Sequence, residues 1–421
     1  MCSAVSRGPT SGRDLPTLRA NRGTRNPERG TWNAGTRERG NAGTRERANA
    51  RTKMIPVNEP LLTEGDYAAV MEALRSGWIS GAGPHVDAFE ARWAAYCGRK
   101  RGVALANGTV ALQCAVALLD LQPDDEVIMP SFTIISCALP IVLANATPVL
   151  VDSDPQTWTM DVGRVASRIT PKTRAIMAVH IYGHPVDMDP LLDLAERHGL
   201  ALIEDAAEAH GAEYHGRRVG SFGTASCFSF YANKLVTTGE GGMLLVDDDR
   251  LAERACRLRN LGFQPDRRFV HAELGFNFRL TNLQAALGLA QIDRMDEIVA
   301  LKRRIGEAYT ERLSEMPGIE LQVQQPWARS VYWMFGLVVC EDTGLDAGEL
   351  ARRLKARGID TRPFFLGMHE QPVFRDRGLF EGESYPVAER LARQGLYLPS
   401  GLALEVGQID RVCTAVREAL A

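Results

Sequence analysis

The chain has 421 residues, of which 45% are hydrophobic, and its formal net charge at pH 7 is −3. It is long and apolar enough to bury a large core, and we expect two lobes or domains. No apolar run approaches the roughly 18 residues that span a bilayer, and the N-terminus lacks the apolar core of a signal peptide. We therefore expect a cytoplasmic protein without a membrane segment. Its 8 cysteines are scattered and include no Cys-x-x-Cys, which predicts reduced thiols rather than disulfides or a metal site.

Residues 1–53 differ from the rest of the chain. They contain a near-repeat, 33–40 and 41–48, few large apolar residues, and 12 Lys/Arg against 4 Asp/Glu. Such a segment buries too little surface to order itself. One interpretation is a basic arm for nucleic acid, but only Trp32 interleaves the arginines. We favour a disordered or misassigned N-terminal extension, with Met54 as the true start and no nucleic acid partner.

The first regular elements surround two loops. Helical spacing covers 66–76 and 90–97, and the loop between them carries Trp78 and Ser80. An apolar strand at 101–106 then leads through Asn-Gly-Thr into a helix predicted at 110–119. Free N–H groups at this helix start favour an anion, Gly108 permits close approach, and Thr109 can add a hydroxyl.

Strands and helices alternate beyond this point, which is typical of a mostly parallel sheet covered on both faces. We predict an α/β fold with a large domain at 54–300 and a smaller C-terminal α+β domain at 301–421. A helix is predicted at 282–292, and a long helical pattern over 284–313 leads into the smaller domain. There, 331–340 has a strand pattern, 349–357 a helical pattern and 361–365 an extended one. The large domain should hold seven strands, at 101–106, 126–130, 148–152, 174–180, 200–205, 226–231 and 242–246.

Two strand ends carry the residues with the most distinctive chemistry. Asp205 ends one apolar strand, and Lys234 follows another, just before a glycine-rich turn. The carboxyl ends of parallel strands are where open α/β sheets bind ligands, so we expect both side chains to face one crevice. Pyridoxal 5′-phosphate (PLP) needs this pair: a lysine forms a Schiff base with its aldehyde, and a carboxylate keeps its ring nitrogen protonated. Singly, each residue is compatible with a solvated lysine or a helix-capping acid.

With these pieces in place, the chain from about Ile55 onward resembles the DegT/DnrJ/StrS family of sugar aminotransferases. The resemblance implies a fold-type I PLP-dependent transferase with a seven-stranded sheet, acting on a nucleotide-linked keto sugar. It is carried by five motifs, Ser76-Gly-Trp-Ile-Ser-Gly81, Asn107-Gly-Thr-Val-Ala-Leu112, Glu204-Asp-Ala-Ala-Glu-Ala-His-Gly-Ala212, Ser229-Phe-Tyr-Ala-Asn-Lys-Leu-Val-Thr-Thr-Gly-Glu-Gly-Gly242 and Gly275-Phe-Asn-Phe-Arg-Leu-Thr-Asn282.

The resemblance also implies roles around the cofactor. Ser229 corresponds to a phosphate ligand, and Glu208 to a side chain facing the cofactor or, alternatively, an exposed helix acid. Ile134 stands where relatives usually present an aromatic to the ring; it can cover the ring but cannot stack, and Phe132 either compensates or is core. Asn277 corresponds to a residue that reaches the partner subunit's phosphate, which implies a homodimer.

Further motifs resemble the branch of the family that aminates GDP-linked 4-keto-6-deoxymannose. They are Trp78-Ile-Ser80, His180-Ile-Tyr-Gly-His-Pro185, Glu208, Val331-Tyr-Trp-Met334 and Thr361-Arg-Pro-Phe-Phe365. The substrate candidates, each of which could instead be a solvated or capping residue, are Trp78, His180, Arg279, Arg362 and His369.

The implied mechanism uses Lys234 as the cofactor's anchor and then as general base and acid, with L-glutamate as the amino donor. Three alternatives remain open. A related branch removes a sugar hydroxyl but has histidine in place of the lysine, and Lys234 argues against it. An amino-acid aminotransferase of the same fold is possible, and so is a non-enzymatic PLP-binding regulator, for which the chain shows no DNA-binding pattern.

Overall fold

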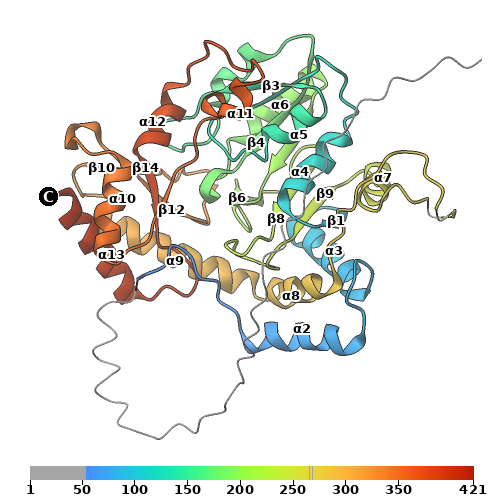
Figure 1. Ribbon diagram of the computed structural model, residues 1–421, viewed down its shortest axis with the longest axis horizontal. Coiled ribbons are helices and arrows are strands. Elements are labelled where there is room, and N and C mark those ends of the chain that lie inside the picture. The colour runs from blue at the N-terminus through green and yellow to red at the C-terminus, as the bar shows by residue number, and fades with distance from the viewer. Residues whose placement is uncertain (1–53, 265, 268) are drawn as a thin grey trace, which may run out of the picture. The chain divides into compact units, whose positions relative to one another are not determined.

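The computed structural model describes residues 54–421 except 265 and 268, so the predicted extension lies outside the described residues. Its main feature is a seven-stranded sheet in the order β1-β9-β8-β5-β4-β2-β3 (Figure 1). Within this sheet only β9 runs antiparallel to its neighbours. The prediction of seven strands in a mostly parallel sheet is confirmed. The strands are β1 (Arg101–Leu105), β2 (Glu126–Pro130), β3 (Thr147–Val151), β4 (Thr173–Val179), β5 (Ala201–Asp205), β8 (Ala225–Ser229) and β9 (Gly242–Val246).

Successive residues of the central strands enter two different cores. In β5, Ile203 packs into the larger core, whereas Leu202 packs into a second core with α6 (Met188–His198). The same alternation occurs in β4, where Met177 and Ile176 face opposite ways. Because side chains in a strand alternate between faces, both faces of this sheet are covered. The apolar character of these strands, without polar positions in between, follows from that double burial.

Helices surround the sheet and continue past it. The helices before the second sheet are α2 (Glu64–Ser76), α3 (Pro84–Cys97), α4 (Gly108–Ala117), α5 (Ala138–Leu143), α6, α7 (Asp249–Arg259), α8 (Asn282–Ile292) and α9 (Met295–Leu313). The helix predicted at 282–292 is α8, and the longer helical pattern predicted at 284–313 is divided between α8 and α9. The break between α8 and α9 lies at Asp293-Arg294, where Arg294 Nη1 donates to Thr63 Oγ1 over 2.6 Å. Thr63 precedes a different helix, so the periodicity of the sequence cannot reveal this contact.

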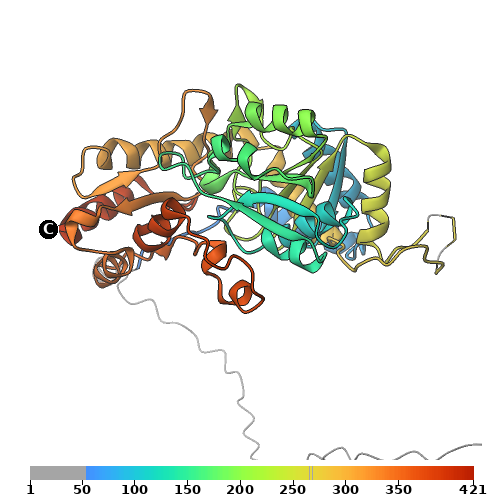
Figure 2. The same ribbon diagram turned by 90° about the horizontal axis from the view of Figure 1, so that it is seen from above.

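A second sheet, in the order β10-β12-β14-β13, lies in the C-terminal part of the chain, and α9 leads to it from α8 (Figure 1). Figure 2 shows these C-terminal elements at one end of the view and the seven-stranded sheet toward the other. The second sheet shares a separate core with α9, α10 and α13, into which Ile55 also packs. The elements are β10 (Ile319–Leu321), β12 (Phe335–Val339), β13 (Arg362–Pro363), β14 (Gly395–Leu398), α10 (Ala347–Ala356), α11 (Pro372–Arg375), α12 (Pro386–Gln394) and α13 (Val406–Leu420).

A third, small sheet joins β6 (Glu213–Tyr214) and β7 (Arg217–Arg218) to β11 (Ala328–Arg329). Contacts unite the described residues as one compact unit, and the division into domains at residue 300 stays a prediction. Within the described chain, none of the helices has the length and apolar character needed to cross a bilayer. The seven cysteines in the described part of the chain are free thiols.

Candidate active site

Lys234 stands in a tight turn that follows β8. The turn is closed by backbone bonds: Lys234 N donates to Tyr231 O over 2.9 Å, and Thr238 N donates to Phe230 O over 2.9 Å. Thr237 Oγ1 adds a bond to the same Phe230 carbonyl over 3.0 Å. The turn directs the lysine inward, and its side chain is only 9% exposed. The expectation of a buried rather than a solvated lysine is therefore met.

The amine of Lys234 lies between an aromatic ring and a carboxylate. Its Nζ is 3.5 Å from the centroid of the Trp333 ring and 3.9 Å from Glu208 Oε1. Burial lowers the pKa of Lys234 below the ordinary value of a lysine, while Glu208 and Asp205 oppose this by raising it. A lysine whose pKa is lowered can act as a base, which the predicted chemistry requires.

Asp205 ends β5 as predicted and is 4% exposed. One of its oxygens accepts a hydrogen bond from Ala207 N over 3.0 Å, and the other accepts one from the Cys137 thiol over 3.1 Å. Both Asp205 and Lys234 also influence the pKa of Glu208, so the three groups share one electrostatic environment. We did not predict Cys137 from the sequence, because a buried cysteine in an apolar stretch carries no pattern that ties it to a strand end elsewhere.

Glu208 is buried beside this pair, and the alternative of an exposed helix acid is wrong. Its side chain is 8% exposed, and its Oε2 accepts a hydrogen bond from the backbone N–H of Tyr182 over 2.7 Å. Burial raises the pKa of Glu208 to about 7, although Lys234 and the Tyr182 amide both lower it. The site thus holds an acid and an amine that both titrate closer to neutrality than free side chains.

Small and polar residues from three segments meet where α4 begins. Asn107 caps the helix by accepting from Val110 N over 3.0 Å. Thr109 Oγ1 lies 2.8 Å from Ser136 Oγ, and a Cβ added to Gly108 would lie 2.7 Å from Ser229 Cβ. Glycine is therefore required for the helix start to approach β8 so closely. We did not predict Ser136, which the chain brings here from the loop after β2.

These groups fit PLP. The start of α4 offers a helix N-terminus with the hydroxyls of Thr109, Ser136 and Ser229 nearby, which suit a phosphate dianion. A buried carboxylate at Asp205 suits a protonated ring nitrogen, and a buried amine at Lys234 suits an aldehyde. The donor set thus matches the three ends of the cofactor, and the individual assignments, including Gly108, stay predictions.

Two of the residues assigned to the cofactor's surroundings by resemblance, Ile134 and Asn277, occupy open positions. Ile134 is 42% exposed, whereas Phe132 is 1% exposed and packs against Tyr182 and Phe364. Of the two interpretations of Phe132, the structure supports core. Asn277 is exposed and pairs with Asn260 in an isolated bridge, so its predicted reach to a partner subunit stays a prediction.

The two histidine candidates lie in the core, and the structure speaks against them as substrate contacts. His180 is 0% exposed; its Nε2 meets Glu204 at 3.2 Å, and its Nδ1 accepts from Val186 N over 3.0 Å. His369 is 3% exposed and lies between Ser131 and Glu389, at 2.9 and 3.2 Å. Each ring uses both nitrogens for protein contacts, so neither nitrogen is left for a substrate.

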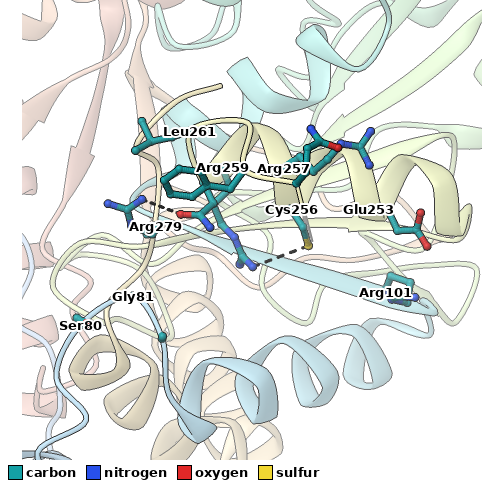
Figure 3. A pocket seen from close by; sticks show the side chains of 13 residues that line it. Ser80, Gly81, Arg101, Glu253, Cys256, Arg257, Arg259, Leu261 and Arg279 are labelled. Atoms are coloured by element: carbon teal, nitrogen blue, oxygen red, sulfur yellow. Dashed lines mark hydrogen bonds between the residues drawn. The ribbon is translucent and has the colours of Figure 1, made fainter. Parts of the chain in front are cut away.

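The other substrate candidates are accessible. Trp78 is 55% exposed, and the Arg362 side chain is 51% exposed and paired with Asp360 at 2.8 Å. Arg279 lines a separate cavity of about 1010 Å³ together with Ser80 (Figure 3), and its Nη1 donates to Asn260 Oδ1 over 2.8 Å. Lys234 does not line that cavity. The contact of Trp78, Arg279 and Arg362 with a substrate stays a prediction.

The fold and the donor set define a PLP-dependent sugar aminotransferase of fold type I, and comparisons with known proteins agree. Residues 60–417 match the model of the DegT/DnrJ/EryC1/StrS aminotransferase family, and the chain belongs to that family. It is 41% identical over 370 residues to the GDP-perosamine synthase of Caulobacter vibrioides, covering 87% of this chain and 98% of that protein.

Two comparisons that involve Streptomyces venezuelae add to this. The chain is 41% identical over 362 residues to its dTDP-3-amino-3,4,6-trideoxy-alpha-D-glucose transaminase, covering 86% of this chain and 93% of that one. The crystal structure of DesV from S. venezuelae has a TM-score of 0.82 and 39% identity, covering 88% of this chain and 99% of that chain. The predicted family, fold type and cofactor are thereby confirmed.

Proposed function

We propose that this enzyme transfers an amino group from L-glutamate to a nucleotide-linked keto sugar, and that the sugar is GDP-4-keto-6-deoxymannose. The observation that best supports this class of reaction is the buried amine of Lys234. It lies 3.9 Å from Glu208, and the charge of Asp205 raises its pKa. The choice of sugar is supported by relatives named GDP-perosamine synthase, at 41, 37 and 36% identity.

When PLP is bound, it supplies an electron sink that stabilises negative charge on the carbon bearing the amine. Hydrogen bonds from Ala207 N and the Cys137 thiol hold the Asp205 carboxylate in place. The negative charge of this carboxylate would favour a protonated ring nitrogen. Lys234 anchors the cofactor and, once released, takes a proton at one carbon and returns it at another through Nζ. Its lowered pKa leaves a share of the amine neutral, as a base must be.

The remaining parts of the proposal concern the oligomeric state, the cellular location and the choice of substrate. We propose a homodimer, in which Asn277 meets the partner subunit's phosphate site, and a cytoplasmic location. Two alternatives for the substrate are kept, another nucleotide-linked keto sugar and a keto acid. The first is favoured by the 41% identity to the Streptomyces transaminase named for a dTDP sugar.

The test uses the purified protein with bound cofactor. Glutamate is expected to convert it to the aminated cofactor and remove the visible band of the lysine-bound form. The aminated protein is then offered GDP-4-keto-6-deoxymannose, a dTDP-linked 4-keto sugar and pyruvate in separate samples. We expect the GDP sugar to restore the band fastest. Restoration by pyruvate alone would contradict the sugar assignment.

The control is Lys234→Ala, which removes the anchor and the base. We expect it to bind the cofactor without the band of the lysine-bound form and to lose activity on the order of 10³-fold or more. Lys302→Arg is the matched variant, because Lys302 is also buried but donates to the carbonyl of Ser400. Retention of the band in Lys234→Ala would show that another lysine holds the cofactor.

A further inference from the structure

The free amine of Lys234 is held on two sides by groups that favour its charged form. Its Nζ lies over the face of Trp333, 3.5 Å from the ring centroid, and 3.9 Å from Glu208 Oε1. An indole face attracts a cation through its quadrupole, and a carboxylate attracts it through its charge. Neither contact is needed to anchor a cofactor. Both contacts favour the free amine in its charged form, as an ammonium ion.

The loop that carries the lysine also orients Trp333. The indole Nε1 donates to the carbonyl of Asn233, the residue before Lys234, over 2.9 Å. Asn58 Nδ2 donates to the same carbonyl over 3.3 Å. Trp333 itself is 4% exposed, so its ring is fixed both by burial and by this bond. The position of the ring face relative to the Lys234 amine is therefore fixed.

Tyr182 connects the ring to the carboxylate. Its backbone N–H donates to Glu208 Oε2 over 2.7 Å, and its own ring stacks on Trp333 at 6.3 Å between centroids. To do both, Tyr182 adopts a φ of 53°, which is unusual for a residue with a side chain. The next residue, Gly183, has a φ of 97°, and a Cβ there would lie 2.8 Å from Trp333 N. The strained turn thus packs directly against the tryptophan segment.

We propose that Trp333 and Glu208 form a receiving site for the amine of Lys234 whenever it is not bonded to the cofactor. The inference rests on the transamination proposed above, in which that amine leaves the cofactor and rejoins it. The neutral amine takes one proton from a carbon and becomes an ammonium ion; it gives the same proton to another carbon and is neutral again. Trp333 and Glu208 hold the ammonium ion between these two steps. Tyr182 is a positioning residue that acts through Glu208.

Lys302 provides a comparison within the same protein. It is 2% exposed, its Nζ donates to the carbonyl of Ser400, and burial alone lowers its pKa to about 7. Lys234 experiences the same effect of burial but has carboxylates that oppose it. If the receiving site exists, removing Trp333 or Glu208 must lower the pKa of Lys234 and leave that of Lys302 unchanged.

The experiment measures both pKa values directly. The chain contains only 6 lysines, so selective ¹³C labelling of lysine gives few NMR signals, and the Cε shift follows protonation of Nζ. The protein is loaded with pyridoxamine 5′-phosphate, which leaves Lys234 free, and is titrated with pH. Lys234→Arg and Lys302→Arg assign the two signals. We expect Glu208→Gln to lower the Lys234 midpoint by about one pH unit, and Trp333→Leu by about half a unit.

Trp333→Phe keeps an aromatic face and most of the packing, so it covers the case in which Trp333→Leu does not fold. Its Lys234 midpoint is expected between those of wild type and Glu208→Gln. An unchanged Lys234 midpoint in Glu208→Gln and Trp333→Phe would overturn the inference, as would equal shifts of Lys234 and Lys302. Failure of the proposed function would give a different result, because the wild-type protein would then not restore its visible band with any keto sugar.

Discussion

Glu204 and Asp205 are neighbours in β5, yet they belong to two regions of opposite character. Glu204 points to the face of the sheet that carries α6, and its carboxylate accepts from Gly220 N, Phe222 N and Ser226 Oγ, each over 2.7 Å. His180 Nε2 completes this set at 3.2 Å. Asp205 points to the other face and accepts one backbone bond and one bond from a thiol, a weak donor.

The difference separates a structural cluster from a functional one. Around Glu204 every carboxylate oxygen is occupied by two protein donors, so nothing remains for a ligand. Around Lys234, the amine has no hydrogen bond to an oxygen within 3.5 Å among the described contacts, and buried polar atoms without a partner include Tyr182 Oη and Asn233 Oδ1. A buried region left incompletely bonded is costly, which is expected where a cofactor completes it.

The strongest test of this comparison exchanges one acid at a time. Asp205→Asn keeps the shape of the side chain but removes the charge at the ring nitrogen. We expect kcat to fall on the order of 10²-fold with little change in thermal midpoint. Glu204→Gln replaces acceptors with a donor amide facing the donors of Gly220 and Phe222. We expect it to lower the free energy of unfolding by about 2–4 kcal/mol.

Steady-state kinetics and urea unfolding, applied to both variants, provide the measurement. The folded fraction of Glu204→Gln should retain the cofactor's visible band. The comparison fails if Asp205→Asn loses stability while keeping its activity, or if Glu204→Gln loses activity at unchanged stability.

The same comparison shows what the sequence could and could not reveal. The seven strands, Asp205 and Lys234 were predictable, because continuous apolar runs mark buried strands and their ends mark the ligand edge. His180 also follows a strand, β4, so the pattern suggested the ligand side. Only the fold shows that its ring turns back to Glu204. Trp333 and Cys137 were missed as site residues for the converse reason, since each reaches the site from a segment distant in the sequence.

A second prediction concerns the pH dependence of stability. Burial raises the pKa of Glu208 to about 7, from 4.5, so the folded protein binds this proton more tightly than the unfolded chain. The resulting stability is present below about pH 4.5 and is lost as pH rises through about 7. Glu208→Gln removes the titration. Relative to wild type, we expect the variant to gain about 1–3 kcal/mol in free energy of unfolding between pH 5 and pH 8.

Urea unfolding of both proteins at the two pH values provides the measurement. Glu349→Gln is the control, because Glu349 is an acid on α10 whose pKa lies below the ordinary value through its bonds to Arg352 and Arg353. It should show no such gain. An identical difference between Glu208→Gln and wild type at pH 5 and pH 8 would mean that Glu208 titrates as an ordinary acid and that the site is less buried than its geometry indicates.

The smallest effect is expected at Arg362, an accessible substrate candidate. Arg362 on β13 is half exposed, and its ion pair with Asp360 should contribute less than about 1 kcal/mol to stability. If Arg362 contacts the sugar diphosphate, Arg362→Gln should raise KM for the nucleotide sugar about tenfold at unchanged kcat, because a charge-assisted bond made equally in ground and transition states is lost. Arg352→Gln, another exposed arginine paired with an acid, is the matched control. An equal KM in both variants would mean that Arg362 does not contact the nucleotide sugar and that its ion pair with Asp360 is only a surface feature.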